Sequence, residues 1–323
     1  MAQPSNTFDT YDAKGIREDL ANVIYNISPE ETPFISNVGK TSAKSTYFEW
    51  QEDSLAATDL NNAQIEGDDA AAVEPAATAR IGNYTQISRK TVTVSGTLEA
   101  VDKAGRKSEM AYQMAKRAAE LKRDMEAIAT SGQAAVGGNS TTARKTAGFG
   151  AFLRTNTNNG ATATEPTLSG TTSGFPNAAA GNGTDRQYTE TILKDVIQQV
   201  WTEGGDARML MVGALLKQRV SAFAGIAQTR FNVNGNKQAT IIGAADIYVS
   251  DFGNLEVVPN RFMPVDVAYH VDPSMAAIAM LRPFEKVELA KTGDADKMML
   301  ICEWGVKVNN ERAHGVARDV TPT

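Results

Sequence analysis

A long amphipathic stretch, residues 101–132, constrains the fold of this chain more than any other feature. Its apolar residues recur at steps of three and four, which places them on one face of an α-helix: Met110, Met114, Ala118, Leu121, Met125 and Ile128. Ser108 or Asp102 is suited to cap the start, and Gly132 to end the helix. A helix over residues 101–130 would be about 45 Å long, as expected for the spine of an extended subunit. An ordinary bundle helix or a short coiled coil is the alternative.

A strongly acidic segment lies between two predicted strands upstream of that helix. Residues 45–50 and 80–96 have the pattern of strands, whereas residues 49–74 contain many alanines, few large apolar residues and no Lys or Arg. The carboxylates of this segment are Glu49, Glu52, Asp53, Asp59, Glu66, Asp68, Asp69 and Glu74. Such a segment buries too little apolar surface to order itself, so we predict a two-stranded finger that lies on another surface. A solvated loop is the alternative, and a calcium site is weakly supported because no regular ligand spacing occurs.

The surface that receives the finger is expected to be basic. We predict that it is the Lys- and Arg-rich face of the long helix in a neighbouring copy, which carries Lys116, Arg117 and Arg123. An N-terminal arm offers a second contact, because residues 15–26 have helical spacing and Phe34 follows as an apolar plug. An N-terminal helix packed on its own domain is the alternative.

The middle of the chain predicts loops followed by a second unit of helices and strands. Residues 137–187 are rich in Gly, Thr, Asn and Ser, which predicts flexible loops or a small insertion with short strands, one of them at residues 150–154. The elements expected next are a helix capped by Thr189 and ended by Gly204-Gly205, a buried strand at 208–212, a helix at 214–223, a turn at Asn234-Gly235 and a hairpin at 246–258. This order predicts helices packed against a mostly antiparallel sheet.

The last part of the chain predicts strands that return to the long helix. The candidates are residues 276–282, 284–290 and 298–308, with a turn at residues 291–297. We expect them to form the sheet on which the long helix packs. Residues 309–323 are expected to form a polar tail.

No motif in the sequence indicates a catalytic site. The sequence lacks G-x-S-x-G, H-E-x-x-H and a complete phosphate-binding loop. His270 and His314 are far apart in sequence, so no zinc site is expected. The single cysteine, Cys302, lies in an apolar run, which predicts a buried strand thiol and not a reactive one. The net charge of −6 argues against strong direct binding of nucleic acid, and no apolar run reaches the ~20 residues of a membrane span. We therefore expect no enzyme activity, no cofactor and no metal.

An ordered set of short motifs resembles the major head proteins of tailed bacteriophages, which have the Hong Kong 97-type capsid fold. The motifs are REDL (17–20), ISPEETPF (27–34), FEWQEDSL (48–55), QISRKTVTVSGT (86–97), ELKRDME (120–126), SDFGNLEVVPNRF (250–262), GD (293–294) and NNERA (309–313). The resemblance covers most of the chain and is weakest between residues 132 and 187. It implies an α+β fold with an N-arm, an extended β-hairpin loop, a peripheral domain with a spine helix, and an axial domain.

The resemblance also implies a division of the chain. The expected parts are an N-terminal arm (1–45), an extended loop (46–96), the spine-helix part of the peripheral domain (97–136), a flexible loop or insertion (137–187), an axial domain (188–275), and return strands with a tail (276–323).

The function implied is that of a shell subunit. Copies of the chain would assemble into hexamers and pentamers of an icosahedral or prolate head around double-stranded DNA, with a separate scaffolding protein, a portal and a decoration protein as partners. The protein would reside in the virion after assembly in the host cytoplasm, with no membrane partner. Some relatives join subunits through a lysine of the extended loop, but residues 51–89 contain no lysine, so self-crosslinking is not expected. The alternatives are a soluble α+β enzyme with an unrecognised carboxylate site and a tail-tube protein.

Overall fold

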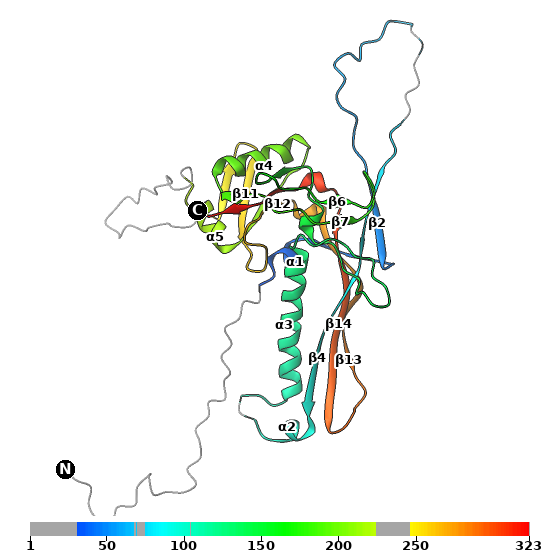
Figure 1. The fold of residues 1–323 in the computed structure, drawn as a ribbon, viewed down its shortest axis with the longest axis vertical. Coiled ribbons are helices and arrows are strands. Elements are labelled where there is room, and N and C mark those ends of the chain that lie inside the picture. Colours follow the sequence, from blue (N-terminus) through cyan, green and yellow to red (C-terminus); the bar gives the residue numbers. More distant parts are fainter. Residues whose placement is uncertain (1–30, 68, 70–74, 104, 224–245, 323) are drawn as a thin grey trace, which may run out of the picture.

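The computed structural model describes residues 31–67, 69, 75–103, 105–223 and 246–322. Figure 1 shows an elongated α+β molecule in which a long helix runs beside one sheet, and a second sheet with its helices lies at the other end. A two-stranded ribbon with a wide connecting loop projects away from both parts (Figure 1). The arm helix predicted at residues 15–26 and the turn predicted at Asn234-Gly235 lie outside the described residues.

The sheet beside the long helix has four strands in the order β1-β13-β14-β4. They are β1 (Gly39–Ser42), β4 (Gln86–Ser95), β13 (Ala276–Glu288) and β14 (Ala295–Val308). β14 pairs antiparallel with both β13 and β4, and β1 runs parallel to β13. β4 therefore belongs to this sheet and not to the extended loop, in which the expected division placed it.

The prediction of two separate strands within residues 276–290 was wrong, because the structure forms the single strand β13 there. The register of β13 against β14 shifts between Met280 and Arg282 and again between Arg282 and Glu285. Pro283 lies inside the second shift, and proline has no amide hydrogen to donate. The strand therefore passes the proline as a bulge and continues.

The long helix, α3 (Glu109–Ala129), is shorter than predicted. Its 21 residues span about 31 Å, and the upstream residues form a separate short helix, α2 (Gly96–Ala100). Gly105, between the two helices, has a φ of +76°, which a continuous right-handed helix does not allow. Ser108 then caps α3, as predicted, by accepting a hydrogen bond from the Ala111 amide. The predicted start at residue 101 was therefore wrong.

The apolar stripe of α3 packs on the four-stranded sheet, as predicted. Leu121 and Met125 are buried in the main core, which also contains Leu300 and Trp304 of β14. Near the start of the helix, Met110 packs with side chains of β4. Met114, Ala118 and Ile128 are partly buried against the main core. The helix therefore stiffens the sheet along most of its length, and we call α3 the spine helix below.

The second sheet has six strands in the order β10-β11-β9-β12-β15-β5. They are β5 (Thr157–Asn158), β9 (Met209–Val212), β10 (Ile247–Ser250), β11 (Gly253–Pro259), β12 (Ala268–Val271) and β15 (Gly315–Ala317). The pairs β11–β9 and β15–β5 are parallel and the other three are antiparallel, in line with the predicted mostly antiparallel sheet. Two helices accompany the sheet, α4 (Glu190–Thr202), capped by Thr189 as predicted, and α5 (Ala214–Ser221).

The segment of residues 137–187 contributes to the main core and has no separate core of its own. Phe149, Phe152 and Leu153 are buried in the same cluster as the spine helix. Its regular elements are β5, β6 (Thr167–Leu168), β7 (Pro176–Ala178), β8 (Arg186–Gln187) and the 3₁₀ turn η1 (Phe149–Ala151). The strand predicted at residues 150–154 was wrong, because η1 occupies its beginning.

Residues 309–321 do not form the polar tail that the sequence predicted. β15 lies inside the six-stranded sheet, and β16 (Val320–Thr321) pairs with β8. The polar side chains of this segment can be buried because they form hydrogen bonds with main-chain amides and carbonyls. Arg318 Nη2 donates to the carbonyls of Gly150 and Leu153, and the Asp319 carboxylate accepts from the Gly160 amide. Composition alone does not distinguish such side chains from a solvated tail.

Candidate functional site

The predicted finger is present as a ribbon that extends from the molecule. β2 (Tyr47–Glu52) and β3 (Ala79–Tyr84) pair antiparallel, with Glu52 opposite Ala79 at the far end of the ladder. Residues 53–78 connect the two strands, and the described residues next to the strands, 53–67 and 75–78, lead away from the rest of the chain (Figure 1). Two strands joined by a long polar segment therefore occur in the predicted order. We call β2, β3 and residues 53–78 the finger below.

The root of the finger is fixed in the core, whereas its tip is not. Trp50 is buried with its ring centroid 6.0 Å from that of Phe152. The Gly82 amide donates to the Gly174 carbonyl, and the Gly174 amide donates to the Arg80 carbonyl, so a third segment supports the ribbon. A two-stranded ribbon is marginal alone in water, and here packing stabilises only its root.

Asn83 holds the finger to the rest of the subunit through both ends of its amide. The side chain is fully buried, and Nδ2 lies 2.7 Å from the Val306 carbonyl oxygen and 2.9 Å from Thr146 Oγ1. Oδ1 accepts hydrogen bonds from the Ala147 amide (2.8 Å) and the Tyr84 amide (2.8 Å). One side chain thus connects β3 to β14 and to the segment of residues 137–187. The sequence does not reveal this role, because a single Asn in a strand gives no pattern.

The predicted interface carboxylates fall into two groups. Asp53, Asp59, Glu66 and Asp69 are exposed on the finger. Glu52, at the finger root, is partly buried, and burial together with the nearby Glu311 carboxylate raises its pKa to about 7. The remaining two sites, Asp68 and Glu74, lie outside the described residues.

The finger also carries aliphatic side chains, which have no recognisable pattern in the sequence. Leu55, Leu60 and Ile65 are exposed to 98%, 96% and 80%, the highest values among the large hydrophobic side chains of the described residues. They recur every five residues, a spacing that matches neither a helix nor a strand. The finger is thus both acidic and aliphatic.

The three predicted basic partners on the spine helix differ in how they are engaged. Lys116 is exposed. Arg117 pairs with Glu120 one turn along the helix at 2.5 Å, and the Arg123 guanidinium lies 5.4 Å from the ring centroid of Phe262. Figure 1 shows the spine helix well separated from the finger of the same subunit, so a contact between them requires another copy.

Phe34 differs from the prediction that it is an interface plug. Its side chain is 1% exposed, and its ring centroid lies 5.2 Å from that of Phe149. The Glu126 carboxylate of the spine helix accepts hydrogen bonds from the Phe34 amide (2.7 Å) and the Ile35 amide (2.9 Å). Burial raises the pKa of Glu126, while these hydrogen bonds oppose the rise. Phe34 therefore belongs to the core of its own subunit and offers no surface to a neighbour.

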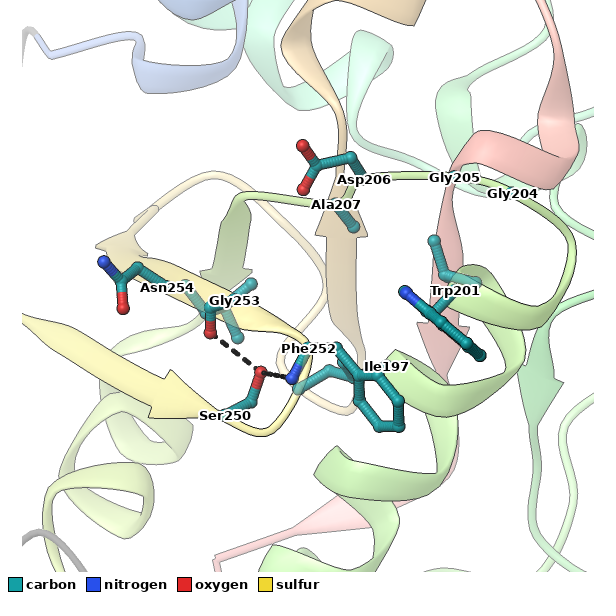
Figure 2. Close-up of a pocket in the computed structure, with 12 residues that line it drawn as sticks. Ile197, Trp201, Gly204, Gly205, Asp206, Ala207, Ser250, Phe252, Gly253 and Asn254 are labelled. Atoms are coloured by element: carbon teal, nitrogen blue, oxygen red, sulfur yellow. Dashed lines mark hydrogen bonds between the residues drawn. The ribbon is translucent and has the colours of Figure 1, made fainter.

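The alternative of an enzyme predicts a pocket with converging acids. Figure 2 shows a pocket of about 310 Å³ between the end of α4 and the β10–β11 turn, where the Trp201 and Phe252 rings lie 5.1 Å apart. Asp206 is the titratable side chain that lines it, and it pairs with Arg208 in an exposed ion pair. Ser250 is engaged with the turn itself, because its hydroxyl donates to the Gly253 carbonyl and accepts from the Phe252 amide (Figure 2). This arrangement provides no acid–base pair.

In the part of the chain that the structure describes, no group of three or more His, Cys, Asp or Glu side chains is placed to hold a metal ion. No described helix is both long and apolar enough to cross a bilayer. Cys302 is buried, and burial raises the pKa of its thiol to about 11. Its buried position confirms the prediction from the sequence.

Comparisons with known proteins agree with these features. A family model described as SU10 major capsid protein matches residues 3–321. The major capsid protein of Escherichia phage Phieco32 is 32% identical over 348 aligned positions, which cover 98% of this chain and 97% of that protein.

Solved capsid structures share the fold at low sequence identity. The capsid of cyanophage A-1(L) aligns with a TM-score of 0.65 at 12% identity, over 97% of this chain and 98% of that one. The capsid of the native GTA particle aligns with a TM-score of 0.60 at 12% identity, with the same coverage. The SrpI encapsulin of Synechococcus elongatus aligns with a TM-score of 0.57 at 10% identity, over 98% and 97% of the two chains. The chain therefore belongs to the SU10 major capsid protein family, and it is a major capsid protein of a tailed bacteriophage, a virion component with the Hong Kong 97-type fold.

Proposed function

We propose that copies of this chain form the hexamers and pentamers of a closed head, and that the finger of each copy lies on its neighbour. The observation that carries the proposal is the exposed finger, whose root is fixed by Trp50 and Asn83 while its tip has no core of its own. Each contact can be weak, because one subunit joins several neighbours and the contacts act together. The protein would form the shell of the head, and we propose no catalytic role for it.

We propose separate roles for the two sheets. The four-stranded sheet and the spine helix act as the peripheral domain, which joins neighbouring capsomers. The six-stranded sheet acts as the axial domain, which gathers around the five-fold and six-fold axes. Residues 315–317 belong with the axial domain in this division, because β15 pairs with β12. The expected boundary at residue 276 therefore does not separate the two domains completely.

Charge supports the proposed placement of the finger. Asp59 and Glu66 are exposed on the finger, and Lys116 is exposed on the spine helix. Opposite charges on two copies would steer the subunits into register during assembly. The net charge of −6 also limits adhesion of the wall to packaged DNA, so we propose that the DNA is enclosed without sequence-specific contacts.

Other partners are proposed from the function alone. A head of this kind requires a scaffolding protein and a portal, which we propose are separate chains, and it can carry a decoration protein. Assembly would take place in the cytoplasm of the bacterial host. Co-expression with the neighbouring structural genes, followed by mass spectrometry of purified particles, would identify these partners.

Limited proteolysis combined with negative-stain microscopy tests the proposed function. Trypsin has no site between Lys44 and Arg80, so a protease that cleaves after glutamate is required, and Glu66 is an exposed target in the loop, outside the paired strands. We expect rapid cleavage there in the free subunit and protection in round shells. The variant E66Q lacks this site and identifies the fragment. Equal cleavage in the two states would contradict the model, and tubes in place of shells would favour the tail-tube alternative.

A further inference from the structure

Two Asn-Gly pairs, Asn159-Gly160 and Asn182-Gly183, lie side by side on one buried carboxylate. The Gly160 amide donates to Asp319 Oδ2 (3.0 Å), and the Gly183 amide donates to Asp319 Oδ1 (2.8 Å). A methyl group on Gly183 would lie 2.8 Å from the Gly160 carbonyl oxygen, so the two pairs approach closely. Because both glycine nitrogens have the same partner, the side chains of the two asparagines can be compared directly.

Asparagine followed by glycine is prone to a spontaneous change of its side chain. The nitrogen of the glycine attacks the side-chain carbon Cγ, and the new C–N bond closes a five-membered succinimide ring. The side-chain nitrogen leaves as ammonia and takes the proton of the attacking nitrogen with it. Water then opens the ring to aspartate or to isoaspartate, in which the main chain runs through the side chain. Glycine favours the attack because it has no Cβ to shield its nitrogen.

The side chain of Asn159 is held by charged partners at both ends of its amide. Asn159 Oδ1 accepts from Arg318 Nη1 (3.2 Å), and Nδ2 donates to Glu165 Oε1. The Glu165 carboxylate is fixed in turn by an ion pair with Arg318 (3.0 Å) and by the Thr157 hydroxyl, which donates to it (2.6 Å). Ring closure requires Cγ to move to bonding distance of the Gly160 nitrogen, and these charge-assisted hydrogen bonds oppose that movement.

The side chain of Asn182 has no such restraint. It is exposed, and it forms no hydrogen bond with any described residue. The main chain on either side is fixed, because the Gly181 amide donates to the Thr164 carbonyl (3.0 Å) and the Gly183 amide donates to Asp319. The attacking nitrogen is therefore held in place, while the side chain that it attacks is free to rotate towards it.

We propose that Asn182 forms a succinimide spontaneously in the folded protein, whereas Asn159 is protected by the contacts of its side chain. Ring closure leaves the Gly183 nitrogen without a hydrogen, so Asp319 loses one of its two amide donors. Opening to aspartate restores this donor and adds a negative charge, whereas isoaspartate lengthens the main chain by one carbon. The modification would accumulate with the age of the subunit, and it does not depend on shell formation.

Incubation of the folded subunit at pH 8, followed by peptide mapping with mass spectrometry, tests the proposal. Trypsin releases both pairs in one peptide, residues 155–186, so fragment ions assign each product within the same molecule. We expect Asn182 to react at least about tenfold faster than Asn159, because the latter must break two hydrogen bonds to charged groups. The matched control is the chain unfolded in guanidinium chloride, in which the two pairs should react at similar rates.

Substitution of Glu165 tests the protection of Asn159 separately. The variant E165A should raise the rate at Asn159 several-fold and leave the rate at Asn182 unchanged. E165Q should raise it less, because its amide oxygen can still accept from the Asn159 amide. An unchanged rate at Asn159 in folded E165A would contradict the protective role of Glu165.

The unmodified chain decides the proposal even if E165A does not fold. Equal rates at the two pairs in the folded protein, or a faster reaction at Asn159, would overturn it. Absence of any product at Asn182 over the time in which the unfolded chain reacts completely would also overturn it.

The variant N182D separates the added charge from the altered main chain. It carries the charge of the product on an unchanged main chain, so it should keep the contact between the Gly183 amide and Asp319. Aged protein that contains isoaspartate at this position should therefore unfold at a lower urea concentration than N182D. Equal unfolding midpoints would contradict the predicted loss of the Asp319 contact.

Discussion

Replacement of Asn83 by Ala is expected to weaken the attachment of the finger more than any exposed substitution on it. Asn83 is fully buried, and its amide joins β3 to the Val306 carbonyl and to both the amide and the carbonyl of Ala147. An alanine leaves the Ala147 amide and the Val306 carbonyl without these partners. Each unsatisfied buried group costs roughly 1–3 kcal/mol, so the loss of two partners should lower the free energy of unfolding by about 2–6 kcal/mol.

The isosteric variant N83D separates shape from hydrogen bonding. A carboxylate can still accept from the Ala147 amide, but it cannot donate to the Val306 carbonyl, which lies 2.7 Å from Nδ2 in the native protein. Two acceptors would then face each other in a buried site, so we expect a loss of stability comparable to that of the alanine variant. The loss should become smaller at low pH, where the new carboxyl group is protonated and can donate.

Urea unfolding of the unassembled subunit, followed by tryptophan fluorescence, measures both effects. Trp50 lies in the strand next to Asn83 and reports directly on the finger root. The control is N61D, an exposed substitution on the finger, which should change stability by less than about 0.5 kcal/mol. If N83A remains within about 1 kcal/mol of the unmodified protein, the assigned role of Asn83 is incorrect.

The remaining predictions concern titratable side chains. Burial lowers the pKa of His270 to about 3 and that of His314 to about 4, so the unfolded chain binds more protons than the folded chain below pH 6.5. The free energy of unfolding should therefore fall by up to about 1.4 kcal/mol per pH unit for each histidine as the pH falls from 6 to 4. The fall should be less steep in the variant H270L. Glu52 acts in the opposite direction, because its pKa is raised to about 7 and its ionised form is disfavoured in the fold. Its contribution to stability is lost as pH rises from 4.5 through 7, and E52Q should remove that part of the pH dependence of the urea midpoint. Cys302 should react with a thiol reagent at pH 8 only on unfolding, since burial raises the pKa of its thiol to about 11, and rapid labelling of the native subunit would contradict its burial.

Periodic features of the sequence predicted the main elements well. The spacing from Met110 to Ile128 specified the buried face of the spine helix, because an amphipathic helix needs a continuous apolar stripe. Strand patterns on either side of an acidic segment specified the finger, since residues 53–66 cannot form a core. In both cases a local pattern and the tertiary environment agree.

Features that depend on single contacts were not predictable in this way. The start of the spine helix was misplaced, because residues 101–107 have helical composition, whereas in the structure Val101 is extended and Gly105 has a positive φ. Phe34 was taken for an exposed plug, because the carboxylate that holds its amide comes from Glu126, 92 residues away. The buried role of Arg318 depends on carbonyls at Gly150 and Leu153, which no nearby sequence pattern specifies.

The position of β15 determines the order in which the six-stranded sheet can form. β15 lies between β12 and β5, yet residues 315–317 are synthesised long after residues 157–158 of β5. β5 therefore has no partner strand in the sheet until almost all of the described chain has left the ribosome. The Val316 amide then donates a hydrogen bond to the Asn156 carbonyl, which lies far earlier in the sequence. Such distant pairings slow folding, and they leave unpaired strand edges exposed while the chain grows. A growing chain thus lacks a complete six-stranded sheet until its synthesis is nearly finished.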